Sequence, residues 1–539
     1  MRMLSKIFRT VIALAVFAVF IVCINFVQNE MNKIKKDSEL TDTDIVHNAP
    51  PVVAFVTVAL GSFRGLAADI LWLRASMLQE KGQYFEMVQI ASLLTKLQPR
   101  FTGAISYLAW NMACNISVVF SKPEDRWRWV KKGLELIRDE AIEYNPSDPI
   151  LYKELGWIYQ HKIGNIMDDA NLYYKQQMAL DYMKVFGSPQ PDWGKITGAP
   201  EKLEEFMGEY PKDDAIWKAM ELSGFNKFQE FERNFREIGF FSQKFTDELK
   251  DPVRQSALEW FLRKKWLKEI YKLDPLKMVQ INKAYGKLDW RLPEAHAIYW
   301  ATIGLEKSKL SEREISNDRM ITQSLKDAFM SGRLLVISRN DYMSMMTMPN
   351  LDLVDTVIRM FKEAYEIHKA KTFKDAAMRN FMVDAIVLTY SFGRYSKAEE
   401  LLKDMRKEFP EDEKLNESLD IFVEKEWKED LGGATMSQAR AMVSSMIYRS
   451  YYYLAYGELE AASAHMKLAV KVYSYYRKDK EGTWERTGMP RFSELKKDML
   501  DACLRSFPPD MGKGLTMEVQ KMENSSKEVK EIEQHEKEN

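Results

Sequence analysis

The chain has 539 residues, and its 78 Lys and Arg against 79 Asp and Glu give a formal net charge of −1. This balance provides no domain-wide basic surface for a phosphate backbone, which argues against general nucleic-acid binding. With 24 glycines, 18 prolines and 46% hydrophobic residues, helix breakers are scarce and a mostly helical chain with a real core is indicated. The 3 cysteines exclude a disulfide-rich scaffold and any four-cysteine metal site.

Residues 10–27 form the first predicted element, because they carry no charge and follow Arg2, Lys6 and Arg9. As a helix these 18 residues rise ~27 Å, close to the ~30 Å hydrocarbon core of a bilayer. The run is longer than the apolar region of a cleaved signal peptide, and no small-residue cleavage site follows it. We therefore expect a tail and an uncleaved transmembrane anchor at 1–28, and a polar linker at 29–48.

The charges beside this anchor do not fix its orientation, since three basic residues precede it and three follow it, namely Lys33, Lys35 and Lys36. A short basic tail before an anchor is typical of proteins that keep the tail in the cytoplasm and export the large domain. Our interpretation is a single-pass membrane protein with a cytoplasmic N-terminus and an extracytoplasmic domain, which in a bacterium is periplasmic.

A second apolar stretch covers residues 49–63, and Arg64 and Asp69 follow it closely. Its 15 residues would rise only ~22 Å as a helix, which is short for a membrane span. We expect a buried core helix or a helix on the membrane surface. The alternative is a second span, which would return the large domain to the cytoplasmic side.

From residue 64 onward the chain shows helical periodicity that glycine and proline interrupt at recurring places. Each interrupted stretch has two amphipathic runs, with a glycine between them in most cases and a breaker near the end. This layout predicts helical hairpins. Four stretches share it: 71–101, 151–174, 381–410 and 447–473.

These stretches resemble the tetratricopeptide repeat, whose first helix carries W-x₂-L-G-x₂-Y and whose second helix has small and aromatic positions before a final proline. The matching residues are Leu155, Gly156 and Tyr159 in a first helix, and Gly393, Tyr395, Ala398 and Pro410 in a turn and second helix. Ile386, Arg74 and Arg449 depart from the pattern, and the resemblance covers about half of the chain. It implies an all-α fold, a degenerate solenoid of helical hairpins that binds a protein or peptide partner in a concave groove.

The motif positions that line the groove in this family fall on Lys153, Trp157, Gln160, His161 and Tyr451. Cationic, amide and aromatic side chains of this kind serve as anchors in protein interfaces. The resemblance therefore implies a partner groove at these five positions. The competing interpretation is that Trp157 and Tyr451 belong to the core, as aromatic residues at helical spacing commonly do.

Glycine and proline are concentrated between Phe186 and Pro211, where 8 of them occur. Such a cluster is typical of a surface loop or an insertion. It divides the chain into several predicted parts. These are an N-terminal helical block at 49–185, an insertion and helical connection at 186–255, a C-terminal helical block at 256–510 and a charged tail at 511–539.

Recognised catalytic motifs are missing from the sequence. None of the 6 histidines lies in H-E-x-x-H, and neither G-x-S-x-G nor a phosphate-binding loop occurs. We therefore expect a scaffold without catalysis, cofactor or metal.

Two polar–aromatic clusters leave a binding pocket or a catalytic site possible. Residues 125–129 with Arg138 and Asp139 would suit an anion or partner pocket framed by tryptophans, although tryptophans filling a core explain the pattern as well.

The second cluster holds an Asp, an Arg, a Glu and a His within eight residues. An acid–base site with the histidine as base is one interpretation, and it would make the chain a membrane-anchored hydrolase or transferase. Capping of a helix that begins at Pro293 is the other. The four residues concerned are Asp289, Arg291, Glu294 and His296.

Overall fold

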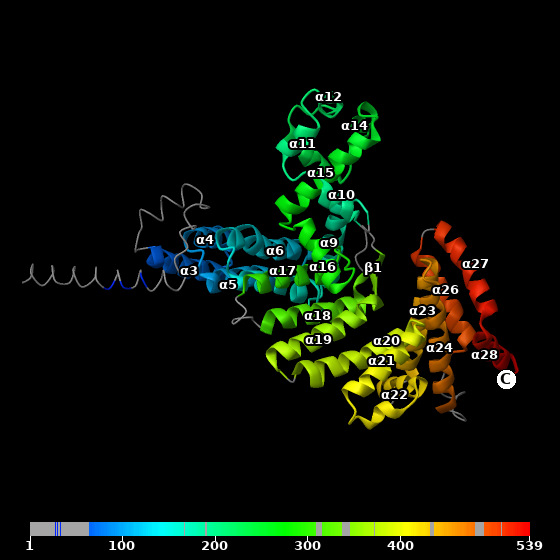
Figure 1. Ribbon diagram of the computed structural model, residues 1–539. Helices are drawn as coiled ribbons and strands as arrows, with labels where there is room; N and C mark the ends of the chain where they lie inside the picture. The colour runs from blue at the N-terminus through cyan, green and yellow to red at the C-terminus, as the bar shows by residue number, and fades with distance from the viewer. Residues whose placement is uncertain are drawn as a thin grey trace, which may run out of the picture. The chain divides into compact units, whose positions relative to one another are not determined.

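The computed structural model describes residues 64–538 together with Val27, Glu30 and Lys33, with gaps at 167, 189–190, 309–314, 337–344, 371, 432–435, 480–489 and 508. Helices make up nearly all of the secondary structure in this part of the chain (Figure 1). The prediction of a helical protein with many helical hairpins is therefore confirmed. No helix in the described part is long and apolar enough to cross a membrane. The predicted anchor, except for Val27, and the apolar stretch 49–63 lie outside it.

The chain divides into two compact units, one of residues 64–158 with 306–308, and one of residues 159–305 with the remainder. Unit 1 is a succession of packed helices. Its elements are α3 (Arg64–Glu80), α4 (Tyr84–Leu97), α5 (Thr102–Trp110), η3 (Asn111–Ile116), η4 (Ser117–Val119), α6 (Pro123–Glu135), η5 (Leu136–Ala141), α7 (Ile142–Tyr144) and α8 (Pro149–Trp157). The π-helical turn η6 (Ile158–Ile163) follows.

Small residues allow close helix packing in unit 1. Gly133 in α6 faces α5 so closely that a Cβ there would lie 2.6 Å from the carbonyl oxygen of Ala109. Ala109 and Ala113 are fully buried at this contact. This is the kind of approach that hairpin repeats require between neighbouring helices.

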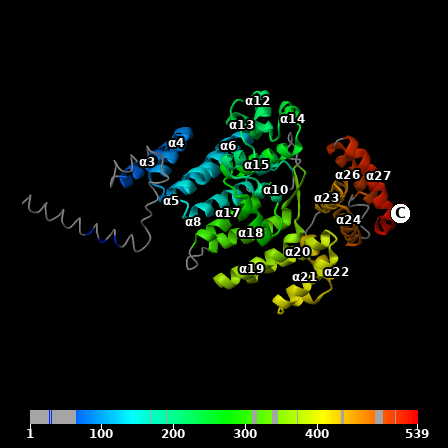
Figure 2. The ribbon, with the colours of Figure 1, turned by 45° about the horizontal axis from the view of Figure 1, so that its top comes forward.

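Unit 2 begins with α9 (Asn171–Phe186) and a lobe of shorter helices. These are α10 (Trp193–Gly198), α11 (Leu203–Glu209), α12 (Ala215–Leu222), α13 (Phe228–Ile238), α14 (Gln243–Glu248) and the longer α15 (Pro252–Ile270). Figures 1 and 2 show α11 to α15 gathered together. From residue 193 onward the Gly/Pro-rich segment forms helices α10 and α11, and Phe206 of α11 stacks on Phe261 of α15 in an aromatic core. Fully buried members of that core are Phe206, Phe235, Phe245 and Phe261.

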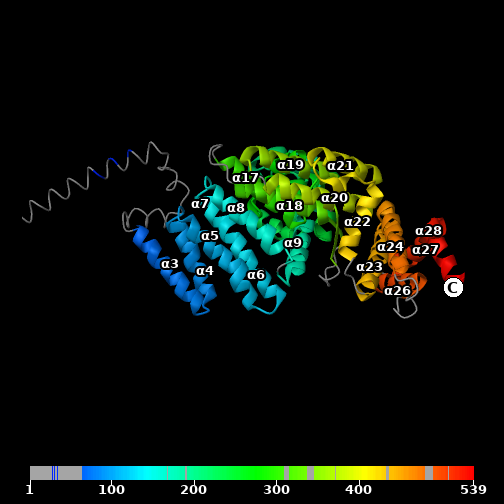
Figure 3. The same cartoon turned by 90° about the horizontal axis from the view of Figure 1, so that it is seen from below.

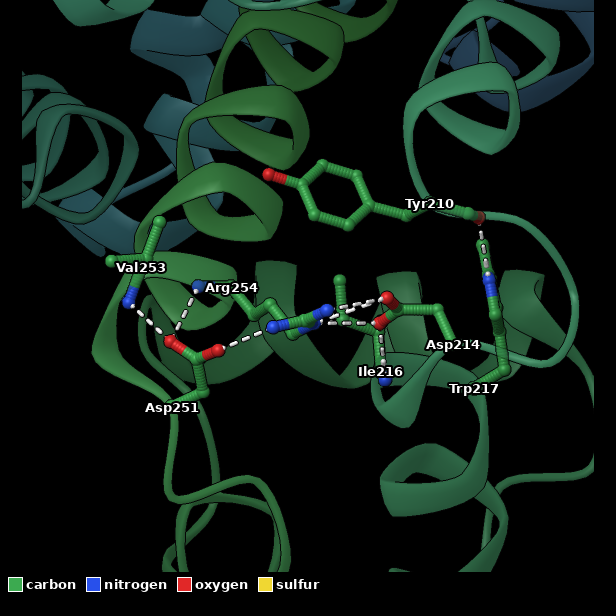
Figure 4. A network of polar contacts seen from close by, with 7 residues as sticks. All are labelled: Tyr210, Asp214, Ile216, Trp217, Asp251, Val253 and Arg254. Carbon is green, nitrogen blue, oxygen red and sulfur yellow. Dashed lines mark hydrogen bonds and ion pairs between the residues drawn. The ribbon is translucent and has the colours of Figure 1, made fainter.

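One arginine ties two helix starts of this lobe together (Figure 4). The carboxylates of Asp214 and Asp251 accept backbone N–H groups at the starts of α12 and α15. The Arg254 guanidinium bonds both, with Nε 3.0 Å from Oδ2 of Asp214 and Nη1 2.5 Å from Oδ2 of Asp251. These bonds hold the pKa of the Asp251 carboxyl below its ordinary value. Sequence composition gave no sign of this arrangement.

The remainder of unit 2, in its described residues, is a run of helices with one short two-stranded sheet. Its elements are α16 (Pro275–Tyr285), α17 (Pro293–Lys307), α18 (Ile315–Ser331), β1 (Arg333–Val336), β2 (Met346–Met348), η9 (Leu351–Leu353), α19 (Val354–His368), η10 (Thr372–Met378), α20 (Arg379–Ser391), α21 (Tyr395–Glu408), η11 (Glu413–Asn416), α22 (Leu419–Leu431), α23 (Met436–Ala455), α24 (Leu459–Asp479), α26 (Phe492–Ser506), α27 (Pro509–Ser525) and α28 (Lys527–Glu538). Strands β1 and β2 pair antiparallel, with Arg333 opposite Met348. Figure 1 shows α18 beside α19 and α20 beside α21, and Figure 3 shows α23 beside α24.

Three of the predicted hairpins share the same turn. Gly82, Gly393 and Gly457 follow the first helix with φ of 70°, 81° and 79°. In each turn the glycine N–H donates to the carbonyl three residues earlier, and the next N–H donates to the carbonyl five residues earlier. A left-handed residue closing a helix in this way suits glycine, which has no Cβ to clash. The hairpins α3–α4, α20–α21 and α23–α24 thus form where the glycine punctuation predicts them.

Candidate functional site

A cleft of about 900 Å³ lies in unit 2. The end of α16, the segment that leads from it to α17, strand β1 and the start of α10 line this cleft. Its floor contains buried Leu288, Trp290 and Leu334, whereas Lys283 and Lys287 are exposed at its rim. The cleft therefore combines an apolar floor with a charged opening, as ligand and peptide sites commonly do.

Backbone geometry and hydrogen bonds fix the segment that forms the floor. Gly286 has φ of 101°, and a Cβ there would lie 2.6 Å from Cδ2 of Leu353. The side-chain oxygen of Asn282 accepts the indole N–H of Trp290 at 3.1 Å. The Asn350 amide donates to the carbonyl of Lys287 at 2.9 Å. These bonds tie the segment to α16 and to the residue that precedes η9.

Asp289 and Arg291 line the cleft as a bidentate ion pair. Nε and Nη2 of Arg291 lie 2.8 and 2.6 Å from the two carboxylate oxygens of Asp289. The pair also bonds the backbone of strand β1, since the Leu334 N–H donates to Asp289 at 2.9 Å and Arg291 donates to the Leu334 carbonyl at 3.1 Å. The two side chains therefore pair the backbone groups of Leu334, which gives them a structural role in the wall.

Glu294 and His296 do not line the cleft. Glu294 is buried beside the start of α17, and burial raises the pKa of its carboxyl to about 7. His296 has no exposed surface, and its Nε2 lies 2.9 Å from the carbonyl oxygen of Trp290. Its ring contacts those of Tyr159 and Tyr182, at 5.1 and 4.4 Å between centroids.

The four residues of the predicted acid–base site therefore do not all line this cleft. Only Asp289 and Arg291 line the cleft, and there they form an ion pair with each other. Helix α17 begins at Pro293, as the capping interpretation expects.

The rim of the cleft carries an excess of positive charge. Arg333 pairs with Glu458 at 3.0 Å, and Asp352 pairs with Arg394 at 2.7 Å. Lys283 and Lys287 form no ion pair among the residues that the structure describes. These two ammonium groups are available to a negatively charged ligand.

Aromatic rings also line the cleft. The indoles of Trp193 and Trp290 pack edge to face, with centroids 6.2 Å apart at 69°. Phe186 packs against Trp193 in a similar way, at 6.1 Å. Faces and edges of this kind hold apolar side chains of a partner, and tryptophan is among the residues that contribute most to binding.

Two residues of the predicted partner groove are interior. Gln160 is buried and donates to the Met320 carbonyl at 3.1 Å and to the Ser324 hydroxyl at 2.8 Å. Tyr451 is 1% exposed, and its hydroxyl donates to Glu523 at 2.7 Å. Helix packing encloses both side chains, which corrects their assignment to a binding surface.

The other three groove residues retain part of their surface. Lys153 is half-buried and pairs with Glu154 at 2.9 Å. Trp157 and His161 are partly exposed, and burial lowers the pKa of His161. None of the three lines the cleft.

The tryptophans of the cluster at residues 125–129 also pack inside, whereas Arg128 is exposed. Trp127 and Trp129 are 8% and 5% exposed. Arg128 pairs locally with Asp125 at 3.1 Å, and Arg138 pairs with Asp139 at 2.6 Å. The interpretation of these tryptophans as core residues therefore holds for the described part of the chain.

Sequence reasoning missed Lys283, Lys287 and Trp193. No motif contains them, and the only sequence signal is a pair of lysines four residues apart before and after the glycine that ends a helix. No family model matches this chain, and no curated protein compared with it is similar to it. Its function is therefore argued from the cleft.

Proposed function

We propose that this chain is a membrane-tethered helical-repeat scaffold, built on hairpins like those of tetratricopeptide repeats, that binds a segment of a protein partner in the cleft of unit 2. The observation that carries the proposal is the pair Lys283 and Lys287 at the rim of a cleft walled by Trp193 and Trp290. Cations beside indoles at the edge of a fixed apolar floor are the chemistry of peptide recognition.

The partner segment is acidic and carries apolar or aromatic side chains. Its carboxylates pair with the two lysines, and its apolar groups cover Leu288 and the tryptophan wall. Since Asp289 and Arg291 bond the Leu334 backbone, the segment is held by side-chain contacts and not as an added strand at that residue.

The tether is the apolar run 10–27, with the N-terminus in the cytoplasm and the large domain outside it. The cytoplasmic alternative applies if residues 49–63 also span the bilayer. The enzyme alternative, a hydrolase or transferase at Asp289, Arg291, Glu294 and His296, has no support from the arrangement of those four side chains.

Fluorescence anisotropy with two labelled peptides tests the proposal. One peptide alternates Glu and Phe, and the other has every Glu replaced by Lys. We expect the full-length chain to bind the acidic peptide at least about tenfold more tightly than the basic one, because two unpaired lysines favour it. The double variant Lys283→Glu/Lys287→Glu should lose most of this preference.

A matched control keeps the change in net charge the same. Lys244 and Lys250 are exposed lysines of unit 2 that do not line the cleft. The variant Lys244→Glu/Lys250→Glu should bind like the unaltered chain within about twofold. Equal binding of the two peptides, or equal losses in the two double variants, would contradict the proposal.

A further inference from the structure

Helix α3 in unit 1 exposes a continuous apolar row. Leu66, Ile70, Leu73 and Met77 are 57%, 57%, 62% and 54% exposed. Their spacing of four, three and four residues places all of them on one face of the helix. The other side of α3 is packed, since Ala68, Ala75 and Leu78 are buried.

A groove of about 520 Å³ runs beside this row. Ile70, Leu73 and Met77 form one side of it, and the side chains at its edge include Arg74 and Lys81. The groove therefore has an apolar centre with charges at its margin. An apolar strip of this kind on the outside of a helix is covered by something in a folded protein.

The position of α3 in its unit limits which kind of element can cover its exposed apolar row. Helices of a hairpin repeat bury their apolar faces against the neighbouring hairpin, and a helix that ends such a stack has a polar outer face. The outer face of α3 is apolar, so α3 does not end the stack. One more helix-sized apolar element belongs on this face.

We propose that the segment Ala49–Phe63 of the same chain packs along the exposed row of α3. This segment has no charged residue and joins directly to Arg64, the first residue of α3. No other apolar stretch is connected to α3 by so short a link.

Length and pattern agree with an antiparallel arrangement. Residues 49–60 as a helix would span ~18 Å, and the row from Leu66 to Met77 spans ~16 Å. With a reversal at residues 61–63, before α3 begins, Leu60, Val56 and Val53 would stand opposite Leu66, Ile70 and Leu73. A Cβ on Gly65 would meet nothing within 4 Å, so the start of α3 leaves room for such a reversal. This inference concerns unit 1 and does not depend on the partner cleft.

Photo-cross-linking tests the pairing in the full-length chain. A benzophenone amino acid replaces Leu73, and the purified protein is irradiated both in mild detergent and in phosphatidylcholine vesicles. The matched control carries the probe in place of Phe85, which is 80% exposed on α4 and does not line the groove. Isotope-labelled and unlabelled chains are mixed, so that mass spectrometry separates adducts within one chain from adducts between chains.

We expect the Leu73 probe to attach to a peptide from residues 49–63 of its own chain, in detergent and in vesicles, and the Phe85 probe not to do so. Adding Val53→Lys and Val56→Lys should reduce this adduct by at least about tenfold, because charged groups do not enter an apolar contact. Attachment of the Leu73 probe to lipid, to a second copy or to another peptide would overturn the proposal, as would the absence of any adduct at Leu73.

Discussion

Glu294 lies one residue after the proline that begins α17, and its side chain is buried. Its Oε2 is buried and has no hydrogen-bond partner among the described residues. Loss of hydration disfavours the charged carboxylate, which raises the pKa from 4.5 to about 7, while Lys175 opposes this change. The sequence left two interpretations of this residue open, an acid–base site and helix capping, because one sequence carries no information on which carboxyl becomes enclosed.

The raised pKa predicts how stability depends on pH. Between pH 4.5 and about 7 the unfolded chain ionises Glu294 while the folded chain keeps it protonated, so the folded state binds more protons. Stability contributed by this group is therefore complete below the unfolded pKa and falls as pH rises toward 7. The loss is on the order of 3 kcal/mol.

The variant Glu294→Gln removes this dependence, because a neutral amide of the same size replaces the carboxyl. We expect it to match the unaltered chain at pH 4.5 and to be more stable at pH 7.5, as measured by urea unfolding at both values. Glu237→Gln, on the exposed side of α13, serves as the control. A stability difference between Glu294→Gln and the unaltered chain that does not change with pH would contradict the assignment.

At the scale of elements, the hairpin turns give the sharpest prediction. Gly393 and Gly457 have nearly the same φ, 81° and 79°, but different surroundings. A Cβ on Gly393 would lie 3.3 Å from the Cβ of Ala464, whereas a Cβ on Gly457 would meet nothing within 4 Å. The left-handed backbone is therefore common to both sites and the steric contact belongs to Gly393 alone.

We expect Gly457→Ala to cost about 1 kcal/mol, the ordinary cost of a left-handed alanine. Gly393→Ala should cost more, since Ala464 in α24 must also move. Gly457→Asn should cost less than Gly457→Ala, because asparagine tolerates this conformation. Urea unfolding midpoints of the three variants provide the measurement, and equal costs for the two alanine variants would show that the contact at Gly393 is unimportant.

These turns also show what the sequence can predict. Glycine that ends a helix is a local signal, so the three hairpin turns were predictable residue by residue. Burial of Tyr451 depends on Glu523, and burial of Gln160 depends on Met320 and Ser324, which lie far along the chain. Likewise Lys283 and Trp193 meet at one cleft only after folding. Local periodicity carries no information on these contacts between distant parts of the chain. The candidate site therefore could not be predicted from the sequence.

At the scale of the whole molecule, the N-terminal apolar run determines on which side of a membrane the partner cleft would work. If residues 10–27 span once with the basic tail inside, alkaline phosphatase fused to the C-terminus should be active in a bacterial host, because it folds only outside the cytoplasm. A β-galactosidase fusion at the same place should be inactive. The reverse result would place the large domain in the cytoplasm.

Removal of residues 1–28 tests which of the two apolar segments, 10–27 or 49–63, anchors the chain to the membrane. If 10–27 is the tether and Ala49–Phe63 packs on α3, the shortened chain should leave the membrane fraction and remain folded, because the exposed row on α3 keeps its cover. Sedimentation followed by circular dichroism measures both properties, and adding Val53→Lys and Val56→Lys should make the released chain aggregate as the row becomes exposed. A shortened chain that stays in the membrane would instead assign the anchoring to residues 49–63. Since one arrangement cannot place those residues both on α3 and across a bilayer, this deletion and the cross-link at Leu73 must agree.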